Sequence, residues 1–197
     1  TSSYPLFGDA GTATAMGFDE QAPEMFFDLN TDGSGYHHII RKYGGFRHPI
    51  DGPEAFEFKD VPDAPGAKMR GVDSYVAGAP IMEFAMREVK PSVLRVLGEA
   101  GLSPEQVDFM FAHQANRLIN ETVRKMAKIA PEKHPYSLTH YGNTSAPSIP
   151  LTMVAGAAQA LRERSVTSLL TGFGVGLSWG SAVIRTRQIS CPPIAEI

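Results

Sequence analysis

An apolar run that ends abruptly in polar residues is the feature that most constrains this chain. Residues 107–112 contain one charged side chain, Asp108, and otherwise have the composition of a buried β-strand. His113, Gln114 and Asn116 follow at once, where a helical pattern begins. Open α/β sheets place their chemistry at the carboxyl ends of strands. His113 is therefore a candidate catalytic residue, and the alternative is a core histidine satisfied by a backbone carbonyl.

A second polar stretch, residues 136–150, favours the functional interpretation. A short strand-like piece runs into Gly142 and Asn143, and Thr144 and Ser145 then have the signature of a helix N-cap. The pattern predicts that the amide of Asn143 lies beside a helix N-terminus. Histidine and asparagine side chains placed in this way can both donate hydrogen bonds to one developing oxyanion.

Three motifs together resemble those of the β-ketoacyl-acyl-carrier-protein synthase III branch of the thiolase-like condensing enzymes. They are His113-Gln-Ala-Asn116, Gly142-Asn-Thr-Ser-Ala146 and the glycine-rich hairpin sequence from Gly172 to Ala182, and they occur in the order of the family. The resemblance covers the C-terminal portion of the family chain. It implies an α/β, thiolase-like layered fold that comprises the C-terminal half and the last strands of the N-terminal half.

The resemblance and the local patterns together divide the chain into four segments. Residues 1–35 are the end of the N-terminal thiolase-like half, and residues 36–78 are a long surface or covering loop region. Residues 79–187 are the C-terminal thiolase-like half with the His and Asn motifs, and residues 188–197 are a tail. The elements expected from periodicity are strands at 12–18, 24–29, 166–171 and 177–187 and helices at 81–100, 115–129 and 149–161.

Several finer expectations follow from individual residues. Pro91 should kink or split its helix, and Gly101 should end it. The helix at 149–161 is apolar almost all round, so we expect it to be buried on every side, with another backbone close to Gly156. Prolines and glycines in residues 36–67 predict a long surface excursion. The histidines in that excursion lack metal-ligand spacing and are expected to face solvent; they are His37, His38 and His48.

Composition indicates an ordinary globular chain of 197 residues, 43% of them hydrophobic. A net charge of −3 gives no overall attraction to nucleic acid or to an anionic membrane. The single cysteine, Cys191, excludes an internal disulfide and suggests a reducing compartment. Because no apolar run approaches the ~20 residues that a membrane-spanning helix needs, we expect a cytoplasmic protein with neither a nucleic-acid nor a membrane partner.

Two rival motifs carry little weight. Gly176-Leu-Ser-Trp-Gly180 has the letters of a serine-hydrolase nucleophile elbow, but that elbow requires a helix after the serine, whereas residues 179–187 have strand composition. The same loop lacks the sixth-position glycine of the Gly-x-Gly-x-x-Gly dinucleotide pattern.

The family resemblance implies a decarboxylative Claisen condensation with no cofactor, between an acyl group delivered by acyl-coenzyme A and a malonyl group on acyl carrier protein. His113 and Asn143 match the residues that polarise the malonyl thioester, and Val175 matches the position whose backbone N–H completes an oxyanion hole. The family's nucleophilic cysteine belongs to a first half that is missing here. Cys191 lies in a tail without a helix N-terminus to activate it. The complete protein is expected to be a homodimer, and this chain alone should be inactive.

A basic platform on the helix that follows His113 is expected to bind the acidic carrier or coenzyme A phosphates. The inward face of this helix is predicted to contain Leu118, Ile119, Thr122, Val123 and Met126, with the basic residues on the outward face. A solvated helix face is the alternative. The residues expected to bind substrate or carrier are Asn116, Arg117, Arg124, Lys125, Lys128, Gly174 and Gly176.

Three hypotheses about function remain open at this point. The first is the C-terminal part of a synthase III of fatty acid biosynthesis. The second is a related acyltransferase or condensing enzyme of secondary metabolism. The third is a non-catalytic partner subunit that only shapes a dimer, although such a subunit has no need of both His113 and Asn143.

Overall fold

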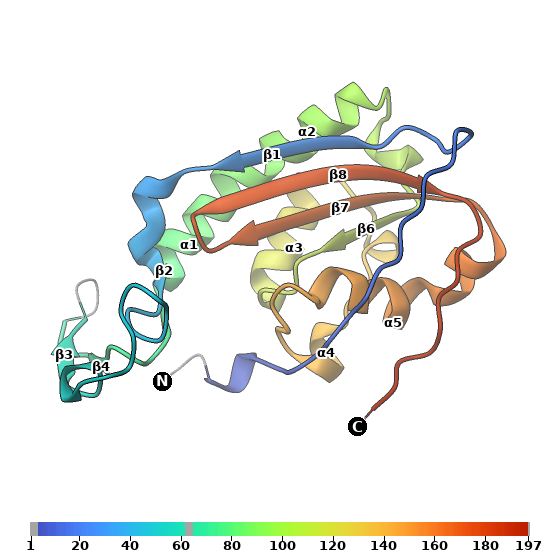
Figure 1. Ribbon diagram of the computed structural model, residues 1–197. Coiled ribbons are helices and arrows are strands. Elements are labelled where there is room, and N and C mark those ends of the chain that lie inside the picture. The colour runs from blue at the N-terminus through green and yellow to red at the C-terminus, as the bar shows by residue number, and fades with distance from the viewer. Residues whose placement is uncertain (1–3, 62–64, 197) are drawn as a thin grey trace.

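A four-stranded mixed sheet with helices on both faces forms the body of the molecule (Figure 1). The structure is a computed structural model, and it describes residues 4–61 and 65–196. The strands lie in the order β1 (Phe26–Thr31), β8 (Ser178–Thr186), β7 (Val166–Gly174) and β6 (Phe109–Ala112). β6 and β7 are parallel, whereas β8 runs antiparallel to both β7 and β1. This arrangement confirms the expected α/β layering and the C-terminal hairpin.

The helix predicted at 81–100 is divided near Pro91, as expected. α1 (Gly78–Phe84) and α2 (Lys90–Glu99) are joined by a π-helical segment, Ala85–Val89. Proline has no N–H, and its ring clashes with the carbonyl four residues earlier, so a wider turn relieves the helix there. Gly101 follows the end of α2 with a φ of 64°, a left-handed conformation that suits glycine.

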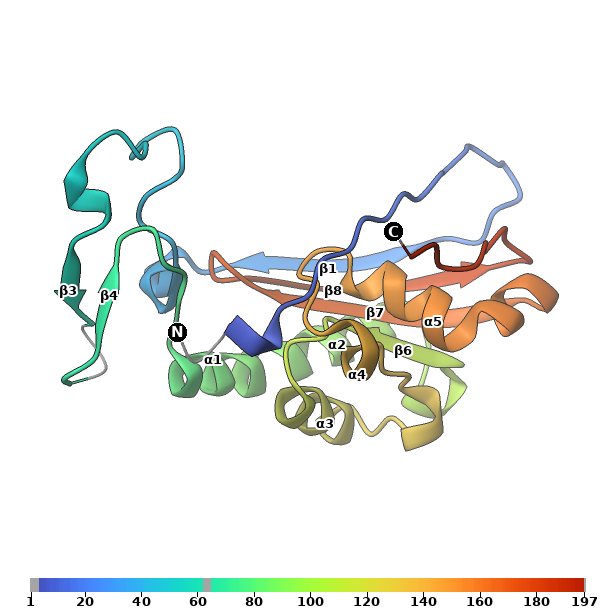
Figure 2. The ribbon, with the colours of Figure 1, turned by 90° about the horizontal axis from the view of Figure 1, so that it is seen from below.

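Two hydrophobic cores lie on the two faces of the sheet, and β6 contributes to both because successive strand residues point to opposite faces. Met110 and Ala112 pack into the core with α1, α2 and α3 (Arg117–Met126). Phe111 packs into the other core, against α5 (Ser148–Glu163), which lies across β6 and β7 (Figure 2). Asp108 accepts hydrogen bonds from the Thr167 backbone N–H and the Arg164 guanidinium, each at 2.8 Å. Asp108, the one charged residue in the apolar run, therefore links the first residues of β6 and β7 by hydrogen bonds.

The helix α5 occupies close to its predicted range of 149–161, but its N-cap differs from the expected one and one of its faces is uncovered. Pro147 rather than Thr144 or Ser145 is its N-cap, because Ser145 adopts a φ of 61° and donates its backbone N–H to the Asn143 side chain. Ala155 and Gly156 are exposed, so the expectation of burial on every side is wrong for the described residues. A neighbour does approach Gly156 closely, but through a side chain: a Cβ at Gly156 would lie 2.4 Å from Cβ of Pro135 and 3.8 Å from its backbone Cα.

The segment predicted to lead into Asn143 as a strand is instead helical. Leu138–Tyr141 forms the short helix α4, which ends at Gly142 with a φ of 66°. The buried Gln114 side chain accepts hydrogen bonds from the Ser137 and Leu138 backbone N–H groups, both at 3.3 Å. This tertiary contact holds the backbone in a turn, so the local strand-like composition does not decide its conformation.

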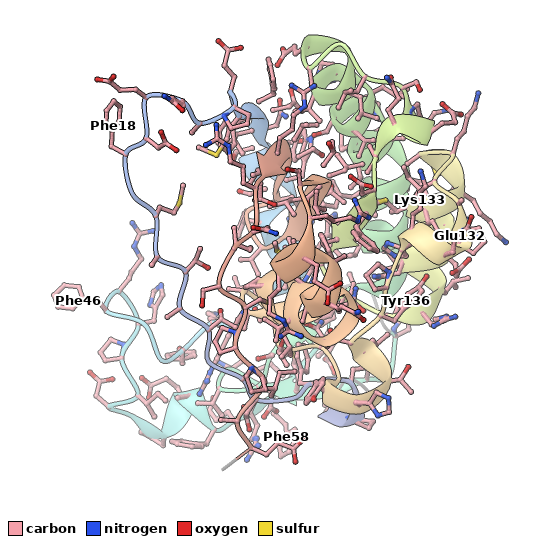
Figure 3. The ribbon with its side chains drawn as sticks, turned by 90° about the vertical axis from the view of Figure 1, so that its right-hand side faces the viewer. Phe18, Phe46, Phe58, Glu132, Lys133 and Tyr136 are labelled. Carbon is pink, nitrogen blue, oxygen red and sulfur yellow. The ribbon has the colours of Figure 1, made fainter. Side chains whose placement is uncertain are left out.

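The N-terminal residues differ most from the sequence-based expectation. Residues 12–18 form no strand and are exposed throughout, because no other strand pairs with them; Phe18 points away from the body (Figure 3). The strand expected at 24–29 is present two residues later, as β1. The turn formers that follow it begin a 3₁₀ helix, Gly33–His38, which is capped by Asp32.

The predicted surface excursion contains two small sheets. β2 (Ile39–Ile40) pairs with β5 (Tyr75–Val76), and β3 (Phe58–Asp60) pairs with β4 (Lys68–Arg70). The β3–β4 hairpin projects beyond the end of the main sheet (Figures 1 and 2). His37 and His48 are exposed as expected, but His38 is half-buried and its ring lies 4.1 Å from that of His37. Residues 62–64 of the excursion lie outside the described residues.

Candidate active site

A cavity of about 740 Å³ opens where β6 and β7 end and α5 begins. His113 follows β6, Phe173 belongs to β7, and Asn143 lies in the loop before α5; all three line this cavity. Apolar side chains supply much of the remaining wall: Leu6, Ile39, Val76, Ile81, Ile119, Ile149 and Trp179. Mostly apolar walls with a few convergent polar groups are typical of a small-molecule site. The structure therefore brings the predicted His and Asn into one site.

The His113 ring sits at the junction of β6, β7 and α5. Its backbone N–H donates to the Thr171 carbonyl at 2.8 Å, which continues the pairing of β6 with β7. Its Nδ1 lies 2.8 Å from Oγ of Ser148, and its ring meets Phe173 edge-on with 5.7 Å between centroids. Burial lowers the pKa of His113 below its ordinary value, and an interaction with the Ser145 backbone only partly offsets this shift. The ring is therefore neutral at pH 7.

Asn143 is held from both sides by the N-terminal segment. Its backbone N–H donates to the Leu6 carbonyl at 2.7 Å, and its carbonyl accepts from the Gly8 N–H at 3.1 Å. Its side-chain Oδ1 accepts from the Ser145 backbone N–H at 2.9 Å. These contacts use the acceptor end of the amide, so its NH₂ group is the end that can donate to a ligand in the cavity.

Gln114 connects the two elements that carry His113 and Asn143. Its side chain is fully buried, and Nε2 donates to the Ala112 carbonyl at the end of β6 at 3.0 Å. Oε1 accepts from Ser137 and Leu138 at the start of α4, which leads into Asn143. Gln114 therefore has a structural role that sequence reasoning missed. The signal that the sequence offered was a polar glutamine directly after the apolar run and beside the catalytic candidate.

The glycine-rich hairpin forms one wall of the cavity. Gly174 and Val175 line it, and Val175 is 69% exposed at the tip between β7 and β8. Gly176, with a φ of 144°, does not belong to the lining. Ser178 is the first residue of β8 and its hydroxyl lies 3.1 Å from that of Thr31. Because a strand rather than a helix follows Ser178, the hairpin is not a nucleophile elbow.

The helix α3 follows the site, with Asn116 as its N-cap. The Asn116 side chain accepts from the Ile119 backbone N–H at 2.9 Å, and both residues line the cavity. Ile119 and Val123 are buried as predicted, but Leu118 is 68% exposed, so its assignment to the inward stripe is wrong.

The predicted basic row is only partly present. Arg124 is 8% exposed, because its guanidinium donates to Glu121 at 2.8 Å and to the Ile129 carbonyl at 2.6 Å. The hydrogen bonds from Arg124 and then from Tyr136 lower the pKa of Glu121 to about 2. Arg124 thus closes the end of α3 and is not an outward residue. Arg117, by contrast, is exposed and places its guanidinium 3.9 Å from the centroid of the Tyr136 ring. Tyr136 itself lies on the α3 side of the molecule (Figure 3).

Comparison with known proteins identifies the family. A family model described as 3-oxoacyl-[acyl-carrier-protein (ACP)] synthase III C terminal matches residues 97–186. Residues 97–186 belong to the 3-oxoacyl-[acyl-carrier-protein] synthase III family. This synthase III region contains β6, α3, α4, α5 and the β7–β8 hairpin, and hence His113, Asn143 and Val175.

Individual synthase III proteins extend the similarity over most of the chain. Beta-ketoacyl-[acyl-carrier-protein] synthase III 1 of Bacillus cereus is 34% identical over 183 residues, which are 91% of this chain and 49% of that protein. The chloroplastic synthase III of Arabidopsis thaliana is 32% identical over 184 residues, 92% of this chain and 45% of that protein. The chain thus spans about half the length of the relatives that it matches.

Solved synthase III structures share the fold. A 2.1 Å crystal structure of 3-oxoacyl-(acyl-carrier-protein) synthase III superposes with a TM-score of 0.72 at 33% identity, over 87% of this chain and 49% of that one. The Pseudomonas aeruginosa enzyme gives 0.69 at 26% identity, over 98% of this chain and 53% of that one. The chain therefore has the thiolase-like layered α/β fold expected from its motifs. The segment boundaries within residues 1–197 stay a prediction.

Cys191 lies away from the cavity that His113 and Asn143 line. It is 6% exposed and packs in the core with Phe111, Leu161 and Val166, and it is not among the residues that line the cavity. In residues 4–61 and 65–196, no three His, Cys, Asp or Glu side chains gather closely enough to hold a metal ion. Nor does any helix in those ranges have the length and apolar character to cross a membrane.

Proposed function

We propose that this chain is the C-terminal part of a 3-oxoacyl-acyl-carrier-protein synthase III of fatty acid biosynthesis. It would catalyse a decarboxylative Claisen condensation between an acyl thioester and malonyl-carrier protein. The observation that carries the proposal is the shared cavity of His113, whose ring is neutral, and Asn143, whose NH₂ group can donate. The names of the relatives, which are β-ketoacyl-carrier-protein synthases, support the same reaction class.

The two donors suit the decarboxylation step. As the bond between the malonyl carbon and its carboxylate breaks, the electron pair moves toward the thioester carbonyl oxygen and forms an enolate. Hydrogen bonds to that oxygen from His113 and Asn143 lower the barrier, because they act where negative charge develops. The enolate carbon then attacks the carbonyl carbon of the acyl thioester; as the carbon–carbon bond forms, the carbon–sulfur bond breaks and the thiolate that carried the acyl group leaves. The backbone N–H of Val175 serves the oxygen of that second thioester, which requires only the amide of this exposed residue.

The nucleophile that carries the acyl group would come from an N-terminal half outside this chain. The burial of Cys191 in an apolar core supports this part of the proposal, since a nucleophilic thiolate needs an accessible, electropositive environment. The complete protein would be a cytoplasmic homodimer that takes its acyl group from acyl-coenzyme A and uses no metal or other cofactor. On its own, the chain should acquire no acyl group from acyl-coenzyme A.

Carrier binding would use the exposed basic residues of α3 and of the turn that follows it rather than the row first expected. Arg117, Lys125 and Lys128 are exposed, whereas Arg124 is paired with Glu121. A cluster of exposed positive charges steers an acidic partner toward the cavity. Asn116 and Gly174, which line the cavity, would shape the passage of the substrate arm beside it. Gly176 lies outside that lining, so the role first expected for it is not part of the proposal.

A chimera provides the test. Residues 1–197 replace the matching half of the Bacillus cereus synthase, and carbon dioxide release from malonyl-carrier protein is measured alongside acylation by acyl-coenzyme A. We expect both activities in the chimera and neither in the chain alone. A folded, acylated chimera that releases no carbon dioxide would favour the non-catalytic subunit. An acyl label on Cys191 of the isolated chain, found by mass spectrometry, would refute the external nucleophile.

A further inference from the structure

The surface excursion carries an ordered turn whose basic residues have no acidic partner. Residues 41–48, the basic turn, are closed by a hydrogen bond of 2.9 Å from the Gly44 N–H to the His48 carbonyl. The Tyr43 N–H ties the turn to the Gly71 carbonyl at 2.9 Å. Three exposed cations of the turn form no ion pair within the described part of the chain, and they are Arg41, Lys42 and Arg47. Lys42 only lies over the Tyr43 ring, 5.8 Å from its centroid.

The opposite charge gathers in the next part of the same excursion. Residues 51–60, the acidic segment, carry four carboxylates and one lysine, whereas residues 36–50 carry no carboxylate at all. Among the described residues, the one ion pair of the acidic segment is internal, between Lys59 and Glu57 at 3.7 Å. β3, which ends the acidic segment, lies at the outer edge of the excursion, whereas β2, which leads into the basic turn, lies next to the main sheet (Figure 1). The two opposite charges therefore do not pair within one copy.

Exposed aromatic side chains accompany both charged parts. Phe46, at the tip of the basic turn, is fully exposed and points away from the body (Figure 3). Phe56 and Phe58, in the acidic segment, are 52% and 65% exposed. Aromatic residues beside arginine are enriched in protein interfaces, where the partner covers them. The excursion thus combines apolar anchors with charges of both signs.

We propose that the excursion is an interface between two copies of this chain, in which the basic turn of each copy binds the acidic segment of the other. Charge complementarity favours this occupant over an unrelated acidic protein, because one excursion presents both of the surfaces that the contact needs. A two-fold axis repeats every contact, so the pairs between the basic turn and the opposing carboxylates form twice. Phe46 is then covered by the second copy.

The proposed interface adjoins one wall of the cavity. β2 and β5 join the excursion to the body, and Ile39 of β2 and Val76 of β5 both line the cavity. A second copy bound to the basic turn therefore stands near this wall. The inference goes beyond the proposed function and does not depend on it, because association uses neither His113 nor Asn143.

Sedimentation equilibrium over a range of protein concentrations tests the self-association. We expect a dimer that weakens as salt rises from about 0.05 M to about 0.5 M, since exposed charges are then screened. Arg41→Glu with Arg47→Glu makes the turn acidic like the segment, and Asp51→Lys with Glu54→Lys makes the segment basic like the turn. Each double variant should associate at least about tenfold more weakly than the wild type, because like charges then face each other. An equimolar mixture of the two should recover the association.

A matched control changes the net charge equally at another place. Lys90→Glu with Lys125→Glu reverses two exposed cations on α2 and α3, and it should associate as the wild type does. All of the substituted side chains are exposed, so circular dichroism and the urea midpoint should be close to those of the wild type.

Four results would overturn the inference. They are a wild type that stays monomeric, double variants that still associate, a mixture that does not recover the association, and a control that loses it. If the wild type is monomeric and Arg41→Glu with Arg47→Glu abolishes binding to acyl carrier protein, the basic turn belongs to a carrier-binding surface instead.

Discussion

Replacing Gln114 by Met tests the connection between the end of β6 and the loop that carries Asn143. Methionine has a similar length and is apolar, so it fills the same buried space without the amide. The substitution removes three hydrogen bonds, those with the Ala112 carbonyl and with the Ser137 and Leu138 N–H groups. Its effect therefore isolates the polar contacts of Gln114 from its packing.

The expected loss of stability follows from which partners remain buried. Ser137 is 1% exposed, so water cannot replace its lost acceptor, whereas Leu138 is only half-buried. One fully buried unpaired donor costs about 1–3 kcal/mol, and the orphaned carbonyl and the second donor add about 1 kcal/mol more. We therefore expect a loss of about 3 kcal/mol. For a chain of this size, that corresponds to a melting temperature lower by roughly 6–12 °C.

Urea unfolding followed by circular dichroism measures the change. Gln159→Met is the matched control, because Gln159 is exposed on α5 and bonds only to Glu163 among the described residues. The control should stay within about 0.5 kcal/mol of the wild type. Should Gln114→Met also stay within that margin, the claim that Gln114 ties α4 to β6 is wrong. A loss confined to Asn143-dependent activity, without loss of stability, would contradict it as well.

Three further predictions concern the site and its surroundings. In the chimera, His113→Ala or Asn143→Ala should lower carbon dioxide release about 10²- to 10³-fold, and acylation much less; equal losses of the two would remove both residues from the malonyl half-reaction. Burial holds the pKa values of His113 and His134 below the ordinary value, so the unfolded state binds more protons, and stability should fall as pH drops below about 6.5; a urea midpoint that is unchanged between about pH 7.5 and pH 5.5 would contradict this. Lys125→Glu should raise the KM for the carrier at low salt and lose this effect at high salt. Arg124→Ala should instead lower stability by about 2 kcal/mol through its lost contacts with Glu121 and Ile129. A raised KM for Arg124→Ala together with an unchanged KM for Lys125→Glu would restore Arg124 to the docking surface.

Local chemistry determined much of the scaffold. The alternation of β6 between two cores follows from its apolar run, and the interruption of α1 and α2 follows from the missing N–H and the ring of Pro91. The left-handed stop at Gly101 follows from glycine itself. Such features depend on the residue and its immediate neighbours, so the sequence alone was sufficient to predict them. The three motifs likewise indicate the family from the sequence alone.

Side-chain direction depended on partners that are distant in the sequence. Arg124 was expected to face outward, but the acceptors on Glu121 and Ile129 turn it inward. Residues 12–18 have strand composition, yet a strand forms only where another strand pairs with it. The exposed face of α5 similarly shows that an apolar helix is buried only on the sides where another element packs.

The residues of the site likewise include some that the sequence identified and one that only the structure revealed. The sequence identified His113 and Asn143 through their motifs, because each occupies a recognisable position beside a strand or a turn. It did not identify Ser148 as the partner of His113, since the two residues are 35 positions apart. Only the packing of the N-terminus of α5 against the carboxyl end of β6 brings that hydroxyl to the ring. A hydrogen bond requires both groups to meet within about 3 Å, and local composition cannot specify that distance.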